Sequence, residues 1–237
     1  MRKRYYKRPT KALRNTVRAL CFGVLFIGLG ILFYVFFPLL SWQVYFVPVF
    51  ASQSLNAPIP KTTVLSGANI SSLLSLSQTI NVDYTNAQNW FPRYRFERGI
   101  KNQTYSLSIP KLKIINANVS TNNTDLTTHL VHYGGTAVPP SKGTAVIFGH
   151  STLPQLFNQK DYKTIFATLY QLQNGDEIIL NVDGKNYYYD VYELSVVDAT
   201  DNSVFDQNYN DSFITLVTCT PPGTVWKRLL IRAKLRT

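Results

Sequence analysis

Three side chains with complementary chemistry, Cys219, Arg228 and His150, lie near the ends of predicted strands. An alternating apolar run at residues 213–217 leads to Cys219, and two prolines and a glycine then force a turn before a second apolar strand begins at Lys227. Arg228, at the start of that strand, would place a permanent positive charge beside the thiol. This pattern is typical of a nucleophile with an electrostatic partner. Taken alone, a single cysteine is more often an inert buried thiol.

His150 follows the apolar run of residues 143–148 and is preceded by Gly149, which permits a tight backbone geometry. Ser151 after it begins a loop. An imidazole that emerges from an apolar strand end is a candidate for a side chain directed into a pocket. The position alone fits a structural histidine equally well.

The two cysteines do not form a disulfide pair in this interpretation, because Cys21 falls inside a long apolar segment. A lone thiol outside the cytoplasm is better explained by reactivity than by structure. No Cys and His cluster has zinc spacing. A solvated loop is favoured over a calcium site for the acids that precede the cysteine strand: Asp198, Asp201, Asp206 and Asp211. The sequence predicts neither a metal nor a cofactor.

The net charge of +11 is concentrated at the amino terminus. The first 18 residues hold eight Lys and Arg and no acids, whereas the remaining residues carry 16 basic against 13 acidic side chains. A nucleic-acid-binding body is therefore not predicted.

Residues 19–40 form an apolar segment that predicts one transmembrane helix. As a helix it would span about 33 Å, close to the ~30 Å hydrocarbon core of a bilayer. The basic residues 1–18 before it predict a cytoplasmic tail, with the remainder of the chain outside the cell membrane. A cleaved signal peptide and a helical hairpin are the alternatives. An uncleaved anchor is favoured, because the run is long for a signal peptide and no clear cleavage site follows it.

Residues 41–103 predict an extracellular stalk and approach segment. From about residue 51 the composition is rich in Ser, Asn, Thr and Gln, which favours a mostly irregular chain with one weak helical piece near residues 70–80. No chemistry is assigned to this segment.

Short predicted strands separated by turns fill the remainder of the chain, residues 104–237. We expect a mainly β fold with seven or eight strands in a closed or nearly closed barrel, and short helical insertions, one of them at residues 162–170. The predicted strands lie at residues 105–109, 113–119, 143–148, 187–197 and 213–217. Residues 171–180 lead through Gly175 and Asp176 into a further strand, and the last strand starts at Lys227.

The segments HYGGTAVPPSKGTAVIFGHS and TLVTC, with an arginine nine residues after the cysteine, closely resemble the sortases, which are cysteine transpeptidases of bacterial cell surfaces. The resemblance runs from about residue 105 to the end of the chain, and it implies a sortase-type β-barrel behind a single membrane anchor. It assigns the nucleophile to Cys219, the histidine to His150 and the arginine to Arg228. Arg232 is a rival for the arginine, but it lies beyond the start of the returning strand.

Two further residues are implied to contact substrate. Thr218 precedes the cysteine in the motif, and His132 lies in the His-Tyr-Gly-Gly-Thr loop, which resembles a family segment on the active-site side. For His132 a solvated or structural role remains open.

The resemblance implies that Cys219 forms a thioester with a surface protein's carboxyl-terminal sorting signal and passes it to an amine of peptidoglycan or of a pilin. Pilus-building relatives often carry a lid with an Asp-Pro-aromatic motif, and residues 89–92 (Asn-Trp-Phe-Pro) match that lid only weakly. This mismatch, with no second apolar helix before Thr237, favours a housekeeping or accessory anchoring role. The alternatives are a membrane-tethered cysteine peptidase that only hydrolyses, and a non-enzymatic β-barrel surface module.

Overall fold

The computed structural model describes residues 11–41, 82–91, 94 and 104–236. The chain divides into two compact units, Met1–Tyr45 and Phe46–Thr237. The helical piece predicted near residues 70–80 lies outside the described residues.

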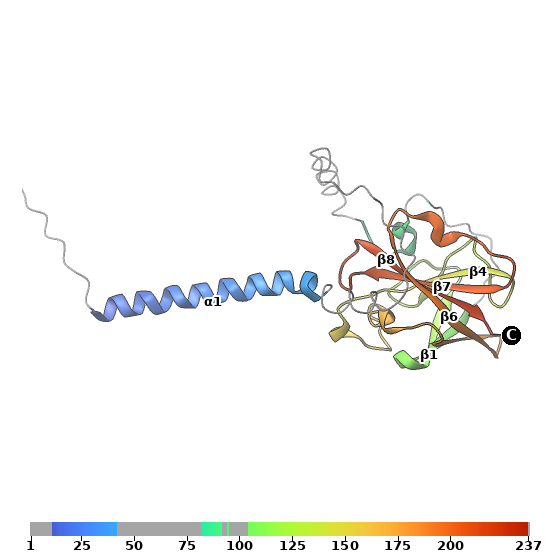
Figure 1. The fold of residues 1–237 in the computed structure, drawn as a ribbon, viewed down its shortest axis with the longest axis horizontal. Coiled ribbons are helices and arrows are strands. Elements are labelled where there is room, and N and C mark those ends of the chain that lie inside the picture. Colours follow the sequence, from blue (N-terminus) through green and yellow to red (C-terminus); the bar gives the residue numbers. More distant parts are fainter. Residues whose placement is uncertain (1–10, 42–81, 92–93, 95–103, 237) are drawn as a thin grey trace, which may run out of the picture. The chain divides into compact units, whose positions relative to one another are not determined.

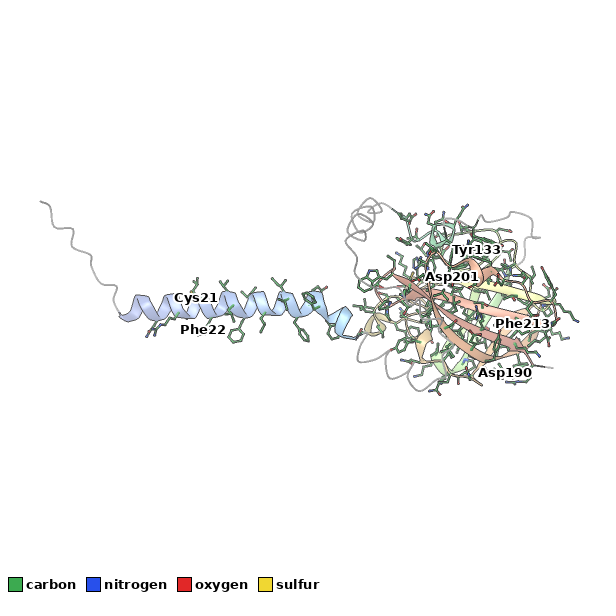
Figure 2. All side chains as sticks on the ribbon, turned by 45° about the horizontal axis from the view of Figure 1, so that its top comes forward. Cys21, Phe22, Tyr133, Asp190, Asp201 and Phe213 are labelled. Atoms are coloured by element: carbon green, nitrogen blue, oxygen red, sulfur yellow. The ribbon has the colours of Figure 1, made fainter. Side chains whose placement is uncertain are left out.

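The amino-terminal unit contains one long helix, α1 (Lys11–Ser41), which includes the predicted anchor at residues 19–40. Most of its described large apolar side chains, from Leu20 to Phe36, are exposed, and Figure 2 shows Cys21 and Phe22 projecting from the helix surface. Over the residues that the structure describes, no helix is both long enough and apolar enough to count as a membrane span.

The second unit is built on a closed barrel whose strand order is β1-β2-β3-β4-β7-β8-β6-β5. Figure 1 shows β4, β7, β8 and β6 in this unit. The strands are β1 (Thr104–Ile109), β2 (Ile114–Ser120), β3 (Leu130–His132), β4 (Gly143–Phe148), β5 (Glu177–Val182), β6 (Lys185–Asp198), β7 (Ser212–Thr220) and β8 (Lys227–Leu235). Short 3₁₀ helices accompany them: η3 (Ala87–Trp90), η4 (Pro110–Leu112), η5 (Pro154–Leu156), η6 (Leu169–Gln171) and η7 (Asn202–Phe205). The predicted mainly β, closed barrel of seven or eight strands is confirmed, and it has eight strands.

Strands β4 and β7 run parallel and form the most buried part of the barrel wall. Every residue of β4 is buried, and all of β7 except Phe213 is buried as well. Continuous apolar runs of this kind are typical of strands that are covered on both faces. By contrast β5 alternates between buried and half-buried residues, as expected for a strand with one face toward solvent.

One strand was missed, and one local prediction was wrong. The three-residue strand β3 was not predicted, although it joins β2 to β4 and closes this side of the barrel. The helical insertion predicted at residues 162–170 is a series of turns that ends in η6. The buried side chains of this segment, Phe166 and Leu169 among them, fill the space between barrel elements without forming a regular helix.

His132 lies in the barrel interior and is fully buried. The Tyr105 hydroxyl lies 2.8 Å from its Nδ1, and the Thr136 hydroxyl lies 3.2 Å from its Nε2. Because neighbouring strand residues point to opposite faces, His132 faces away from Val131 and Tyr133, which pack in the cluster that contains Cys219. The structure thus places His132 in a buried polar network and not at the surface where a substrate would contact it.

Burial lowers the pKa of His132 from its ordinary value of 6.5 to about 4. Between these two values the unfolded chain binds a proton at this position and the folded chain does not, so stability falls as the pH is lowered through this window. We expect the free energy of unfolding to fall by about 2 kcal/mol more in the wild type than in His132→Gln between pH 7 and pH 5. Urea unfolding at the two pH values measures this difference, and equal pH dependence in the two proteins would contradict it.

Candidate active site

Cys219 lies one residue before the end of β7, on the face of the sheet that residues 87–91 and η7 cover. Its cross-strand partner in the antiparallel pair with β8 is Arg228. The Cys219 side chain is only 5% exposed. Burial raises the pKa of the thiol to about 11, and the positive charge of Arg228 acts in the opposite direction.

Arg228 is 1% exposed, and its guanidinium is held by main-chain carbonyl groups. Nη1 donates to the carbonyls of Val225 (3.0 Å) and Lys227 (3.2 Å), and Nη2 donates to the carbonyl of Trp90 (3.1 Å). The buried Nε has no hydrogen-bond partner among the described residues. The three carbonyl acceptors of Nη1 and Nη2 offset part of the cost of burying this charge, because an unpaired buried charge is costly to desolvate. The result is a fixed cation beside Cys219 that retains one donor for a further acceptor.

His150 follows β4 in a turn whose backbone is tightly constrained. A Cβ atom on Gly149 would clash with the Phe166 ring and would lie 2.7 Å from Leu130 Cδ2, so only glycine fits before the histidine. The Phe166 amide donates to the His150 carbonyl at 2.9 Å. Burial lowers the pKa of the imidazole, whereas the carboxylates of Asp125 and Asp83 oppose this shift.

The residues of the cover segment, as we call residues 82–91, pack over these groups. The ring of Trp90 lies 5.7 Å from that of His150 and 5.2 Å from the Arg228 guanidinium carbon, with Phe91 at 5.7 Å from the same carbon. Trp90 and Phe91 are buried. The cover segment therefore shields the histidine and the arginine together.

Backbone hydrogen bonds attach the cover segment to the loop between β2 and β3. The Ala87 amide donates to the Thr124 carbonyl and the Leu126 amide donates to the Thr85 carbonyl, both at 2.8 Å. The indole Nε1 of Trp90 donates to the carbonyl of Tyr84 at 2.8 Å. This part of the predicted irregular approach segment is thus ordered against the barrel. The available signal was the adjacent pair of large aromatic residues in a segment otherwise rich in small polar ones.

The structure brings Cys219, His150 and Arg228 to one end of β4, β7 and β8, and it separates the other candidates from them. Thr218 faces away from Cys219, and its hydroxyl donates to the Gly149 carbonyl at 2.7 Å. Arg232 forms an ion pair with Glu193 at 2.7 Å.

Three of the four acids considered for calcium have other partners. Asp198 and Asp211 form ion pairs with Lys227 and Lys234, and Asp201 accepts a hydrogen bond from the Ser203 amide at the start of η7.

A thiol, an imidazole and a fixed guanidinium at adjoining strand ends of a closed barrel define a site suited to acyl transfer by a cysteine nucleophile. Comparison with known proteins gives the family. The model of the family described as "Sortase domain" matches residues 107–236, which is more than half of the chain. The chain belongs to the sortase family, as the resemblance of its motifs implied.

Two curated relatives are similar over part of their length. Sortase A of Listeria monocytogenes is 32% identical over 94 residues, which are 40% of this chain and 39% of the relative. Sortase D of Bacillus subtilis is 27% identical over 135 residues, which are 54% of this chain and 61% of the relative. The matches therefore span less than two thirds of either relative.

Among solved structures, sortase C-1 from Actinomyces oris superimposes with a TM-score of 0.51 at 21% identity, covering 72% of this chain and 98% of that one. This likeness supports the fold.

Truncation of the cover should expose the thiol. In a Cys21→Ala background, we expect Trp90→Ala to raise the rate of Cys219 alkylation by iodoacetamide at pH 7.5 about tenfold. Less burial lowers the thiol pKa, and one pKa unit corresponds to about a tenfold change in thiolate. The matched control is Trp226→Ala, since Trp226 is 60% exposed, and it should leave the rate unchanged. An unaltered rate in Trp90→Ala would show that the indole does not shield Cys219.

Proposed function

We propose that this sortase is a membrane-anchored cysteine transpeptidase that cleaves a sorting signal of surface proteins and transfers the acyl group to an amine acceptor. The observation that carries the proposal is the cross-strand pairing of Cys219 with the buried Arg228, next to the turn that presents His150. Nucleophile, proton carrier and oxyanion stabiliser are the three groups that acyl transfer from a peptide bond requires.

In the proposed reaction the Cys219 sulfur attacks the scissile carbonyl carbon, a C–S bond forms, and the C–N bond breaks. His150 gives a proton to the departing amine. A second amine then attacks the thioester, its proton passes to His150, and the sulfur leaves as the new amide forms. A thiol suits this exchange because it is both a good nucleophile and a good leaving group.

Arg228 stabilises the negative charge that develops on the carbonyl oxygen. Nη2 already donates to a main-chain carbonyl, that of Trp90, and a substrate carbonyl is the same kind of acceptor. A planar guanidinium anchored through Nη1 is better suited to this role than the mobile ammonium of a lysine. Binding of a peptide in this way requires Trp90 to move from its place over Arg228 and His150.

With the cover in place, both titratable groups favour their neutral forms. Burial raises the pKa of Cys219 to about 11 and lowers the pKa of His150 below its usual value. Admission of solvent and substrate reduces both effects, which favours transfer of the thiol proton to the imidazole. The proposal thus couples substrate entry to thiol activation.

The proposed location is the cell membrane, with the amino terminus in the cytoplasm and the barrel outside. The supporting features are the uncharged residues 19–40, the exposed apolar side chains of α1 and the basic residues before them. This location would place the barrel near surface proteins and near acceptor amines of peptidoglycan or a pilin.

Intact-mass measurement tests the transpeptidation. The full chain in detergent, mixed with a library of sorting-signal peptides, should gain an acyl adduct on Cys219 that is absent in Cys219→Ala, and an added amine should discharge it as a new amide. Discharge by water alone, whatever the amine concentration, would identify a hydrolase. Failure of every peptide to load Cys219 would contradict the enzymatic proposal.

The arginine variants give a matched comparison within the same assay. Arg228→Lys should lower kcat/KM by about 100-fold or more, the usual cost of losing one oxyanion donor. Arg232→Lys lies on the same strand but pairs with Glu193, so it should stay within about twofold of the wild type. Equal effects of the two substitutions would contradict the role of Arg228. His150→Ala, which removes the proton carrier, should abolish turnover.

Cell fractionation tests the anchor. We expect the full chain to remain with membranes through an alkaline carbonate wash and to be released by detergent, because about 20 apolar residues suffice to span a bilayer. Protease added to intact cells lacking a wall should digest the barrel. Release by carbonate, or protection of the barrel in intact cells, would contradict the proposed location.

A further inference from the structure

Three hydrogen bonds connect the turn that carries His150 to the strand that carries Cys219. The Gly149 amide donates to the Val217 carbonyl at 3.1 Å. The Thr218 hydroxyl donates to the Gly149 carbonyl at 2.7 Å, and the Ser151 hydroxyl donates to the Cys219 carbonyl at 2.7 Å. Residues 149–151 are thereby attached to residues 217–219 on both sides of each reactive residue.

These bonds begin where the regular pairing of β4 with β7 ends. The parallel register runs from Gly143↔Ser212 to Phe148↔Val217, after which the chain leaves β4 while β7 continues to Thr220. Beyond that point the hydroxyls of Thr218 and Ser151 form the hydrogen bonds between the two segments, where a longer β4–β7 pairing would have used backbone groups. The turn can therefore leave the sheet to present His150 and still keep a fixed distance from β7.

We infer that Ser151 and Thr218 are positioning residues that hold the His150 imidazole in register with the Cys219 thiol. The inference rests on the proposed function, since it assigns both hydroxyls to the geometry of that reaction. Neither hydroxyl needs to touch the substrate. Thr218 acts through the Gly149 carbonyl, and Ser151 acts through the carbonyl of Cys219 itself.

The local packing leaves few other ways to fix the turn. Gly149 admits no side chain, because Phe166 and Leu130 occupy the space where a Cβ would be. The His150 carbonyl is held by the Phe166 amide, so the hydroxyl of Thr218 completes the hydrogen bonding of the backbone on the side toward β7. Removal of the Thr218 hydroxyl would leave the buried Gly149 carbonyl without this donor, and the turn would move to find another.

A shift of the turn should affect the chemical step more than substrate binding. Misplacement of a catalytic group by about 1 Å can cost on the order of 100-fold in rate. The peptide would bind on the covered face of β7 and β8, whose pairing does not depend on either hydroxyl. The expected result is a lower kcat with a nearly constant KM.

The test compares four substitutions in the full chain in detergent, with transpeptidation kinetics as the readout. Ser151→Ala and Thr218→Val should each lower kcat about tenfold or more and change KM less than about twofold. Thr218→Ser keeps the hydroxyl and should restore most of kcat. The matched control is Thr220→Val, because Thr220 is equally buried on the same strand but its hydroxyl has no hydrogen-bond partner among the described residues. It should match the wild type.

A double-mutant cycle on thiol alkylation tests the same inference without any peptide, in the Cys21→Ala background. Ser151→Ala should slow alkylation of Cys219 at neutral pH about fivefold when His150 is present and should have no effect in His150→Ala, since the two residues act as a unit.

An unchanged kcat in Ser151→Ala and Thr218→Val would overturn the inference, and so would an alkylation effect that persists without His150. Should the wild type load no peptide at all, the proposed function would fail, while the alkylation cycle would still decide whether the Ser151 hydroxyl positions His150.

Discussion

The pairing of β7 on both of its edges determines where every reactive group lies. Parallel pairing with β4 brings the turn carrying His150 beside Cys219, and antiparallel pairing with β8 places Arg228 directly across from the thiol. Because side chains alternate along a strand, a slip of one residue in either register would turn Cys219 toward the barrel interior and Thr218 toward the covered face. Burial of β7 on both faces makes such a slip costly, since almost every position of the strand has a packed environment. The relative positions of Cys219, His150 and Arg228 are therefore fixed by the strand register of β4, β7 and β8.

The second constraint is the buried positive charge. A carboxylate partner would neutralise Arg228, as Glu193 does for Arg232 four residues further along the same strand. The hydrogen bonds that Arg228 makes among the described residues go instead to neutral main-chain carbonyls. These acceptors stabilise the two terminal nitrogens of the guanidinium without cancelling its charge, so its field still acts on the Cys219 thiol. In the proposed reaction, Arg228 is in this way prepared to stabilise the anion that develops on the substrate carbonyl.

The sequence predicted the features that depend on local pattern. Apolar runs located β4, β7 and β8. The proximity of Cys219 and Arg228 followed from a tight turn between two predicted strands. Features that depend on tertiary contacts were not predicted. β3 has only three residues, too few for a periodic signal. The cover segment is held by tertiary contacts with the loop after β2, with Arg228 and with the rings of Phe148 and Phe205. The burial of His132 in a polar network was not specified by the loop motif either, because a shift of a single residue decides which face of a strand a side chain occupies.

Under the proposed function, the cover segment keeps the Cys219 thiol inert through contacts that a substrate would replace. Trp90 provides Arg228 with both a carbonyl acceptor and an aromatic face, and it shields His150 with the same ring. A peptide that displaced Trp90 would offer its own carbonyl to Arg228, so one hydrogen bond would replace another. The free-energy cost of opening would then come mainly from the apolar surface that Trp90 and Phe91 expose. A peptide with apolar side chains of its own can cover the surface that those two rings leave. Under the proposed function, opening of the site is thus favourable only when a suitable peptide is present, and the activation of Cys219 follows from the same exchange.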